Sequence, residues 1–269
     1  MKSRVALMIG GAAAIVFGMT WLCGAADEGG AKKRILFYSE SDGFPHSVVV
    51  RPLTGEVAFA EKIFKEIATK AGYEVYLSQS FHDLENEGKF NRYDAVVFYT
   101  TGDPKIDRKS LFKWLRSGKA FIGIHAATDT FKSDPEYVKM VGGSFKVHGA
   151  GDRKVTITIE DRDHPATRML PAEWVIADEI YQMNDFSKDN VHMLMSIDTE
   201  KTDLKPQNMK KGEYYPVAYT RTEGKGRVFY TSLGHREDVW TNPLYQQHLM
   251  AGVAWALGEA KDKASQAEK

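Results

Sequence analysis

Four short, unbroken runs of apolar residues constrain the fold of this chain more than any other feature. They cover residues 35–38, 95–99, 120–124 and 228–230. Strands that are covered on both faces have this pattern, because neither face meets water. Apolar residues at helical spacing separate the first two runs, and a glycine stands where this helix would end. The order of strand, helix and strand predicts a doubly wound α/β domain with a mostly parallel sheet and helices on both faces.

The middle of the chain has a different pattern. Val155, Ile157 and Ile159 alternate with threonines, which indicates a strand with one wet face and hence an antiparallel extension or edge. Residues 175–181 and 191–197 are two further candidate strands, and the charged segment 201–213 reads as a surface loop. Without an internal repeat or linker, residues 34–258 are expected to form one domain, followed by a charged tail at 259–269.

The first residues have the order of a secretory signal. Lys2 and Arg4 precede an apolar run at residues 5–22, and small residues and then acidic ones follow. We therefore expect residues 1–26 to be a signal peptide and the protein to be exported, either periplasmic or extracellular. An uncleaved N-terminal anchor and a lipoprotein attached through Cys23 are the alternatives, because the run nearly spans a bilayer. A membrane would be a partner only through this segment.

Charge and cysteine content exclude several classes of protein. The chain has 36 Lys and Arg and 36 Asp and Glu, so no net positive field attracts a phosphate backbone, and nucleic acid is not an expected partner. The single cysteine, Cys23, lies in the N-terminal segment. A form cut after it would contain no thiol, which excludes cysteine hydrolases, thiolate zinc sites and disulfides.

Polar residues follow each predicted parallel strand, where open α/β sheets bind ligands. His46 comes after the first run, His125 and Asp129 after the third, and Thr231 and His235 after the fourth. A single histidine at a strand end is usually structural. Convergence of several at one edge of the sheet would favour a site, so we expect His46, His125 and His235 to share a pocket mouth.

The segment Gly123-Ile124-His125-Ala126-Ala127 is the sharpest local motif. Its small residues and spacing resemble the turn that exposes the nucleophile of α/β hydrolases, with histidine in the nucleophile position. An imidazole there can act as a general acid or base or bind a metal ion, but it does not form a serine-type or cysteine-type acyl intermediate. The alternative is a tight strand exit whose histidine only braces a loop.

Glu179 and Tyr181 form a second candidate pair. Alternation within a strand at 175–181 would put both on one face, and a partly buried carboxylate has a raised proton affinity suited to a base. A solvated acidic edge strand is the alternative. The sequence thus predicts His125, Glu179 and His235 as catalytic residues and His46, Asp129, Tyr181 and Thr231 as substrate-binding residues. His125, His148 and His235 with a carboxylate would suit zinc, although no short His-x-x-x-His spacing supports a metal.

Several segments together resemble the trehalose-utilisation, or ThuA-like, family, which belongs with the class I glutamine amidotransferase-like folds. The resemblance covers roughly residues 34–258. The matching segments are SDGFPHS (41–47), FIGIHAATDTF (121–131), GGSFKVHG (142–149), DHP (163–165), ADEIYQ (177–182), PVAYTR (216–221) and GKGRVFYTSLGHRED (224–238). The resemblance implies a flavodoxin-like core in which His125 occupies the position of the amidotransferase cysteine, and this excludes glutamine hydrolysis.

The family is associated with the use of disaccharides, which implies sugars or keto-sugar derivatives as substrates. Our first hypothesis is therefore an enzyme, a hydrolase, lyase or isomerase, that acts on a keto-glycoside by acid–base chemistry, with or without a metal such as zinc. The second is a non-catalytic exported module that binds a saccharide. A third is a scaffold domain held at the membrane by its first segment.

Overall fold

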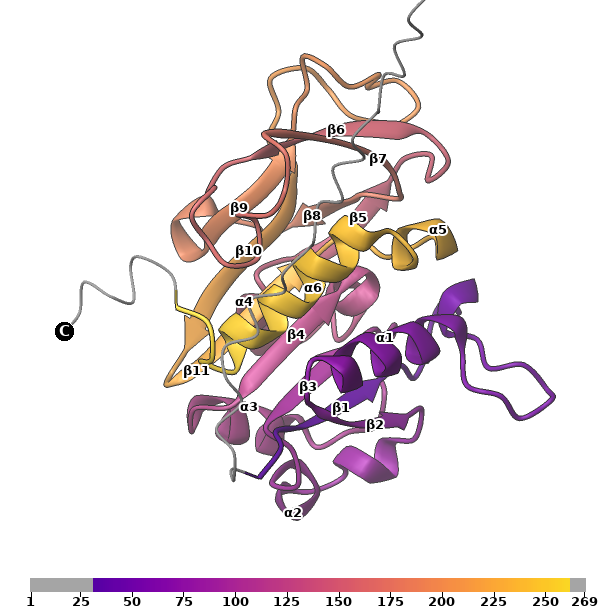
Figure 1. Cartoon of the computed structure of the whole chain (residues 1–269), viewed down its shortest axis with the longest axis vertical. Coiled ribbons are helices and arrows are strands. Elements are labelled where there is room, and N and C mark those ends of the chain that lie inside the picture. The colour runs from indigo at the N-terminus through magenta and orange to yellow at the C-terminus, as the bar shows by residue number, and fades with distance from the viewer. Residues whose placement is uncertain (1–30, 262–269) are drawn as a thin grey trace, which may run out of the picture. The chain divides into compact units, whose positions relative to one another are not determined.

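A computed structural model describes residues 31–261, and a nine-stranded sheet runs through them (Figure 1). The strands are β1 (Arg34–Tyr38), β2 (Glu74–Ser78), β3 (Ala95–Phe98), β4 (Ala120–Ile124), β5 (Ser144–His148), β6 (Lys154–Ile159), β7 (Glu173–Ala177), β8 (Tyr181–Asn184), β9 (His192–Ile197), β10 (Pro216–Glu223) and β11 (Gly226–Thr231). The helices are α1 (Phe59–Lys70), α2 (Glu87–Phe90), α3 (Arg108–Arg116), α4 (Pro135–Val141), α5 (Glu237–Trp240) and α6 (Pro243–Ala256). Short 3₁₀ turns are η1 (Ser47–Val49), η2 (Phe81–Leu84), η3 (His125–Asp129) and η4 (Lys188–Asn190).

Five neighbouring strands of this sheet are parallel, in the order β2-β1-β3-β4-β11. This is the strand order of flavodoxin-like sheets, in which ligands bind beyond the carboxyl ends of the strands. Four of the five are the unbroken apolar runs of the sequence, and the fifth, β2, directly follows α1. The predicted α/β class and flavodoxin-like core are thus confirmed.

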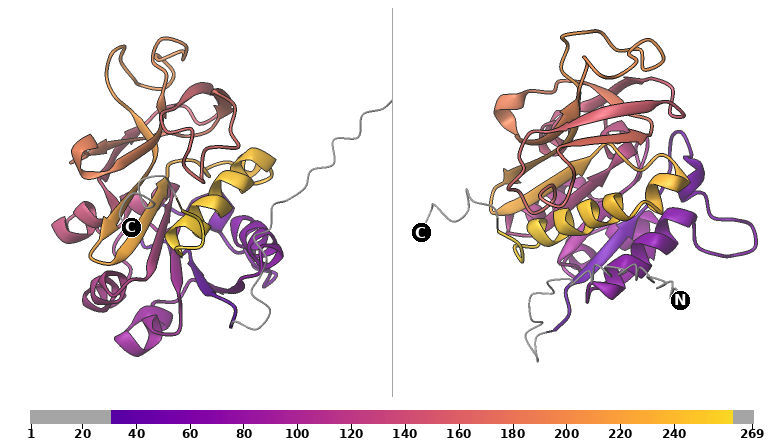
Figure 2. Two further views of the ribbon diagram at one scale, coloured as in Figure 1. Left: turned by 60° about the vertical axis from the view of Figure 1, so that its left-hand side comes forward. Right: turned by 45° about the horizontal axis from the view of Figure 1, so that its top comes forward.

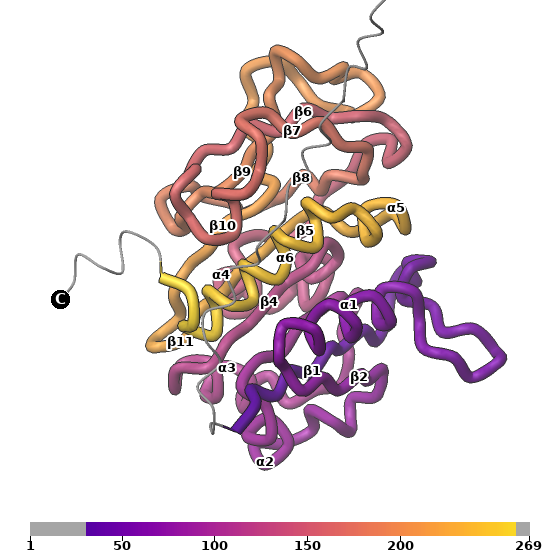
Figure 3. Tube along the Cα trace, viewed as in Figure 1, coloured from indigo at the N-terminus to yellow at the C-terminus, as the bar shows by residue number. Residues whose placement is uncertain are grey.

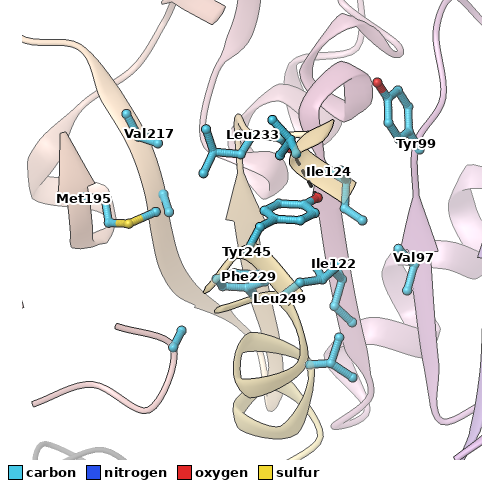
Figure 4. Close-up of a cluster of buried hydrophobic side chains, with 14 of the residues drawn as sticks. Val97, Tyr99, Ile122, Ile124, Met195, Val217, Phe229, Leu233, Tyr245 and Leu249 are labelled. Carbon is cyan, nitrogen blue, oxygen red and sulfur yellow. Dashed lines mark hydrogen bonds between the residues drawn. The ribbon is translucent and has the colours of Figure 1, made fainter. Parts of the chain in front are cut away.

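Two hydrophobic cores cover the two faces of the sheet. Successive residues of a strand point to opposite faces, so Ile35 and Phe37 pack in one core with α1 and α6, whereas Leu36 packs in the other with α2, α3 and α4. Figure 2 shows the helices on both sides of the sheet. Tyr245 and Leu249 of α6 lie against the strands in the first core (Figure 4).

Helix ends follow ordinary capping rules. The side chain of Asn242 accepts a hydrogen bond from the Leu244 amide, and Pro243 occupies the first turn of α6. Gly72 follows α1 with a φ of 99°, a conformation that costs glycine little, so the chain turns there into β2.

The sheet continues as an antiparallel extension in the order β11-β10-β9-β6-β7, which confirms the expected extension. The tube in Figure 3 follows the chain through it. A tight turn at Gly224-Lys225 joins β10 and β11 as a hairpin. Strands β5 and β8 form a separate two-stranded sheet.

The expectation of one strand over residues 175–181 is wrong. The strand β7 ends at Ala177 and β8 begins at Tyr181, and they pair in different sheets. Asp178 and Glu179 lie in the break, where Asp178 accepts two backbone hydrogen bonds. His148 is the last residue of β5. A local pattern cannot reveal either feature, because both depend on partners distant in the chain.

The predicted signal segment at 1–26 and residues 262–269 of the predicted tail lie outside the described residues. Within residues 31–261, none of the helices has the length and apolar character that a membrane crossing requires.

His248 in α6 is a fully buried histidine. Its Nδ1 lies 2.7 Å from the carbonyl oxygen of Ala166, and its Nε2 lies 3.3 Å from the hydroxyl of Thr231. A carbonyl only accepts, so Nδ1 carries the hydrogen and the ring is satisfied as the neutral form. Burial is the main cause that lowers the pKa of His248 to about 4.

This burial makes the stability of the fold depend on pH. Between a pKa of about 6.5 in the unfolded chain and about 4 in the folded one, only the unfolded chain takes up the proton, so stability falls as pH falls. Denaturant unfolding measured at pH 7 and at pH 5 tests this. From pH 7 to pH 5, the free energy of unfolding of the wild type should fall by about 2 kcal/mol more than that of His248→Gln. Equal losses in the two proteins would contradict this role.

Candidate functional site

Three histidines and one glutamate from four separate segments meet beyond the carboxyl ends of the parallel strands. His46 follows β1, His125 follows β4, His235 follows β11, and Glu179 lies between β7 and β8. One nitrogen or oxygen atom of each lies within 4.8 Å of the corresponding atoms of the others. We call these four residues the histidine cluster. The three imidazoles that the sequence placed at one edge of the sheet therefore do lie together.

The backbone of His125 adopts a conformation that is rare for residues with a side chain. Its φ is 44°, in the left-handed region, which costs a non-glycine residue about 1–3 kcal/mol. The hydroxyl of Tyr230 donates to the carbonyl oxygen of His125 at 2.9 Å and helps to hold this turn. Nearby Gly123 leaves little room, since an added Cβ would lie 3.2 Å from the Cβ of Ala127. The turn at His125 therefore resembles the nucleophile turn of α/β hydrolases in its strained backbone conformation as well as in its residue spacing.

One hydrogen bond fixes the tautomer of His125. The Nδ1 atom lies 2.8 Å from the carbonyl oxygen of Ser232, which follows β11. Since a carbonyl only accepts, Nδ1 carries a hydrogen, and in the neutral imidazole the lone pair is therefore on Nε2. This Nε2 lies 3.2 Å from Nδ1 of His235 and 3.6 Å from Oε1 of Glu179. The lone pair of His125 is therefore directed into the cluster.

Glu179 contacts histidines through both of its oxygens. Its Oε1 lies 3.5 Å from Nδ1 of His235, and its Oε2 lies 3.0 Å from Nδ1 of His148. Burial alone would raise the pKa of Glu179, but the adjacent imidazoles of His125, His235 and His148 outweigh burial and lower the pKa. The expectation that this carboxylate has a raised proton affinity is thus wrong, and the group is anionic at neutral pH.

The carboxyl group whose pKa is raised is that of the neighbouring residue, Asp178. Burial raises the pKa of Asp178 to about 7, against the opposing effects of His125 and of backbone amides. Its Oδ2 accepts from the amide of Gly234 at 2.6 Å, and its Oδ1 accepts from the amide of Glu179 at 3.0 Å. Asp178 therefore ties the segment that carries Glu179 to the segment that carries His235. The sequence did not assign this positioning role to Asp178.

Two of the imidazoles are neutral at neutral pH. Burial, then the proximity of other histidines, lowers the pKa of His46 to about 2. Burial is also the first cause that lowers the pKa of His235 to about 4. Nε2 of His46 lies 3.0 Å from the hydroxyl of Tyr181, and the ring of Tyr181 packs on that of His125 with centroids 4.2 Å apart.

The remaining predicted residues lie outside the histidine cluster. Asp129 forms an ion pair with Lys132. Thr231 is fully buried, and its hydroxyl contacts His248 in the core and not the cluster. Of the predicted zinc set, His148 lies outside the cluster and contacts the outer oxygen of Glu179, while His46 joins the group in its place. Thr231 is the last residue of β11, the strand that His235 follows, but its hydroxyl is directed at α6.

An open hollow of about 750 Å³ lies beside the cluster. Glu179 and His235 form part of its wall, together with polar residues before and within α5. The remaining lining residues are Ser47, Phe59, Gly151, Asp152, Arg236, Glu237, Asp238 and Thr241. This composition offers many hydrogen-bonding groups to a polar ligand that reaches the histidines.

Residues 34–256 match a family model described as ThuA, trehalose utilisation. The chain belongs to the ThuA family. This confirms the resemblance drawn from its motifs and links the chain to carbohydrate use at the level of the family. No curated protein matches the chain.

Solved structures of bacterial proteins share the fold of this ThuA-family chain. A protein described as ThuA-like from Bacteroides uniformis has a TM-score of 0.71 at 21% identity, over 89% of this chain and 97% of its own. A second, from Parabacteroides merdae, has a TM-score of 0.67 at 19% identity, over 87% of this chain and 93% of its own. At these identities the similarity concerns the fold.

The backbone strain at His125 can be measured with two variants that both lack the imidazole. His125→Gly should be more stable than His125→Ala by about 0.5–1 kcal/mol, because glycine adopts a positive φ without steric cost. Denaturant unfolding measures the difference. Glu66, exposed within α1, is the matched control. There the order should reverse, with Glu66→Gly about 1 kcal/mol less stable than Glu66→Ala. The same order at both positions would contradict a left-handed His125.

Proposed function

We propose that this ThuA-family chain is an enzyme that acts on a disaccharide or a keto-sugar derivative through histidine and glutamate acid–base chemistry. Membership of a family described by trehalose utilisation supports the carbohydrate class. The free lone pair on Nε2 of His125, beside an anionic Glu179 and an open polar hollow, carries the proposal of catalysis. Several titratable groups with shifted pKa values in one cluster favour a catalytic site over a purely structural one.

A ketone in the sugar ring is the substrate feature that best suits these groups. It acidifies the C–H bond on the neighbouring carbon, and Nε2 of His125 is the base that accepts this proton. The electron pair of the broken C–H bond moves toward the carbonyl and forms an enolate, which His46, His235 and Tyr181 stabilise by hydrogen bonding. In elimination, the enolate then expels the glycosidic oxygen on the next carbon, and this oxygen takes up a proton.

Glu179 supports the same step through charge. As an anion 3.6 Å from Nε2 of His125, it stabilises the imidazolium that forms when His125 accepts a proton.

The enolate has two further possible outcomes. Reprotonation gives isomerisation, and addition of water after elimination gives net hydrolysis. Glutamine hydrolysis is excluded from the proposal, because histidine in the position of the nucleophile forms no thioester.

Turnover of oxidised disaccharides tests the proposal. The panel consists of keto-disaccharides and their unoxidised parents, and incorporation of deuterium from D₂O next to the ketone reports proton abstraction. We expect His125→Ala to lower kcat/KM by roughly 10²–10⁴-fold, the usual contribution of a general base. His192→Ala, which removes an exposed histidine paired with Asp161 outside the cluster, is the matched control and should retain activity. Full turnover by His125→Ala would refute the assigned chemistry.

A sugar-binding module without activity is the second reading of the same site. Its supporting observation is Phe44, whose ring is 65% exposed and packs against His46 with centroids 5.1 Å apart, as an aromatic platform for a sugar would. Tight saccharide binding by the wild type, with neither turnover nor deuterium incorporation for any sugar of the panel, would decide for the module.

We also propose that the protein acts after export. The order of charges and apolar residues in the first 26 residues supports this. Expression of the full chain in a bacterium, followed by mass spectrometry of the purified protein, should give a form that begins after Ala25 or Ala26 in the periplasmic fraction. A protein that retains Lys2 and Arg4 would point to an anchor, and a lipid on Cys23 to a lipoprotein.

A further inference from the structure

We infer that His46, His125, His235 and Glu179 bind a divalent transition-metal ion, and that their geometry fits zinc best. The part of this ion in catalysis rests on the function proposed above, whereas the binding of the ion does not. The inference depends on the distances between the ligand atoms, the hydrogen bonds that orient them and the chemistry of the donors.

The distances between three of the four ligand atoms match the edges of a zinc tetrahedron. Nε2 of His125 and Nδ1 of His235 are 3.2 Å apart, and Oε1 of Glu179 lies 3.6 Å and 3.5 Å from them. Ligands at about 2.0–2.2 Å from a tetrahedral zinc ion are roughly 3.3–3.6 Å from one another. These three atoms therefore form one triangular face of such a tetrahedron, and His46 offers a nitrogen within 4.8 Å of each.

Hydrogen bonds outside the cluster orient two of the ligands as metal sites require. Histidines that bind metals nearly always donate their other ring nitrogen to a carbonyl or carboxylate, which directs the lone pair at the ion. His125 does so through Nδ1 and the carbonyl oxygen of Ser232. Glu179 receives the matching support, because His148 contacts Oε2 at 3.0 Å and leaves Oε1 for the cluster. His148 is thus an outer partner of the site.

His46 supplies an independent sign of a missing partner. The residue is only 2% exposed, and its Nδ1 atom has no hydrogen-bond partner among residues 31–261. Its other nitrogen, Nε2, contacts the hydroxyl of Tyr181. His46 thus has one ring nitrogen without a partner, in a site where two other imidazoles and a carboxylate already converge.

The donor set selects the class of ion. Three imidazoles and one carboxylate suit first-row transition metals such as zinc, whereas calcium and magnesium require mostly oxygen ligands. Glu179 and His235 also line the open hollow, so an ion between them is within reach of a ligand there. With the ion bound, the lone pair on Nε2 of His125 would be a metal ligand and would no longer accept a proton. The metal-bound protein would instead polarise a sugar carbonyl as a Lewis acid, whereas His125 would act as the base in the metal-free protein.

Metal analysis of the full chain tests the inference directly. The protein is treated with a chelator, titrated with zinc and analysed for bound metal, and its melting temperature is followed in parallel. We expect one zinc per chain and a higher melting temperature with zinc, because an ion that binds the folded state stabilises it. Cobalt in place of zinc should give the intense visible absorption of a tetrahedral site. Weak, octahedral-type absorption or no stoichiometric binding would overturn the inference.

Two ligand variants and one control locate the ion. Glu179→Gln keeps the size of the side chain and removes its charge, and His235→Ala removes an imidazole. Each should weaken zinc affinity by roughly 100-fold or more. His192→Ala removes an exposed pair with Asp161 that resembles a surface metal site and should bind zinc like the wild type. Zinc binding that survives both ligand variants or disappears in His192→Ala would overturn the assignment, and melts without metal establish that each variant is folded.

The outcomes for the ion and for the proposed function are separable. Stoichiometric zinc in a protein that turns over no keto-sugar supports the metal site and counts against the function. Turnover that is unchanged after a chelator has removed all metal supports the function. If the protein also binds no zinc at zinc concentrations close to its own concentration, the metal site is overturned.

Discussion

The hydrogen bond from Nδ1 of His125 to the carbonyl oxygen of Ser232 is the interaction on which the site depends. It joins the ends of the neighbouring strands β4 and β11 and fixes which nitrogen of His125 carries a hydrogen. Tyr230 makes a second connection between the same strands through the carbonyl oxygen of His125. Together these bonds hold the strained turn and direct Nε2 at His235 and Glu179. The orientation of the cluster is therefore built into the sheet itself.

Asp178 connects the antiparallel extension to the parallel core. Its two oxygens bind the amides of Gly234 and Glu179, which precede His235 and follow β7. The antiparallel strands thereby bring to the cluster its only carboxylate among the described residues. A flavodoxin-like core alone would present three histidines at its strand ends. The extension supplies the negative charge that stabilises a protonated histidine or a bound cation there.

The errors of the sequence interpretation have a common cause. Residues 175–181 have the composition of one strand, yet the strand ends before Asp178, whose carboxylate binds the distant amide of Gly234 and the adjacent amide of Glu179. The carboxylate with the raised proton affinity is Asp178 and not Glu179, because three histidines surround Glu179. Thr231, though next to Ser232 in sequence, contacts His248 of α6 in the core. Each outcome was decided by neighbours that no local pattern contains.

The sequence by itself determined the class of the fold, its parallel strands and the convergence of His46, His125 and His235. Unbroken apolar runs are buried on both faces, and parallel strands all end at one edge of a sheet, so position in sequence implies position in space. Only the tertiary structure decided that Glu179 completes the cluster, that His148 supports it from outside and that Asp178 fixes it in place. These roles depend on distances of about 3 Å between segments far apart in the chain, which local periodicity does not encode.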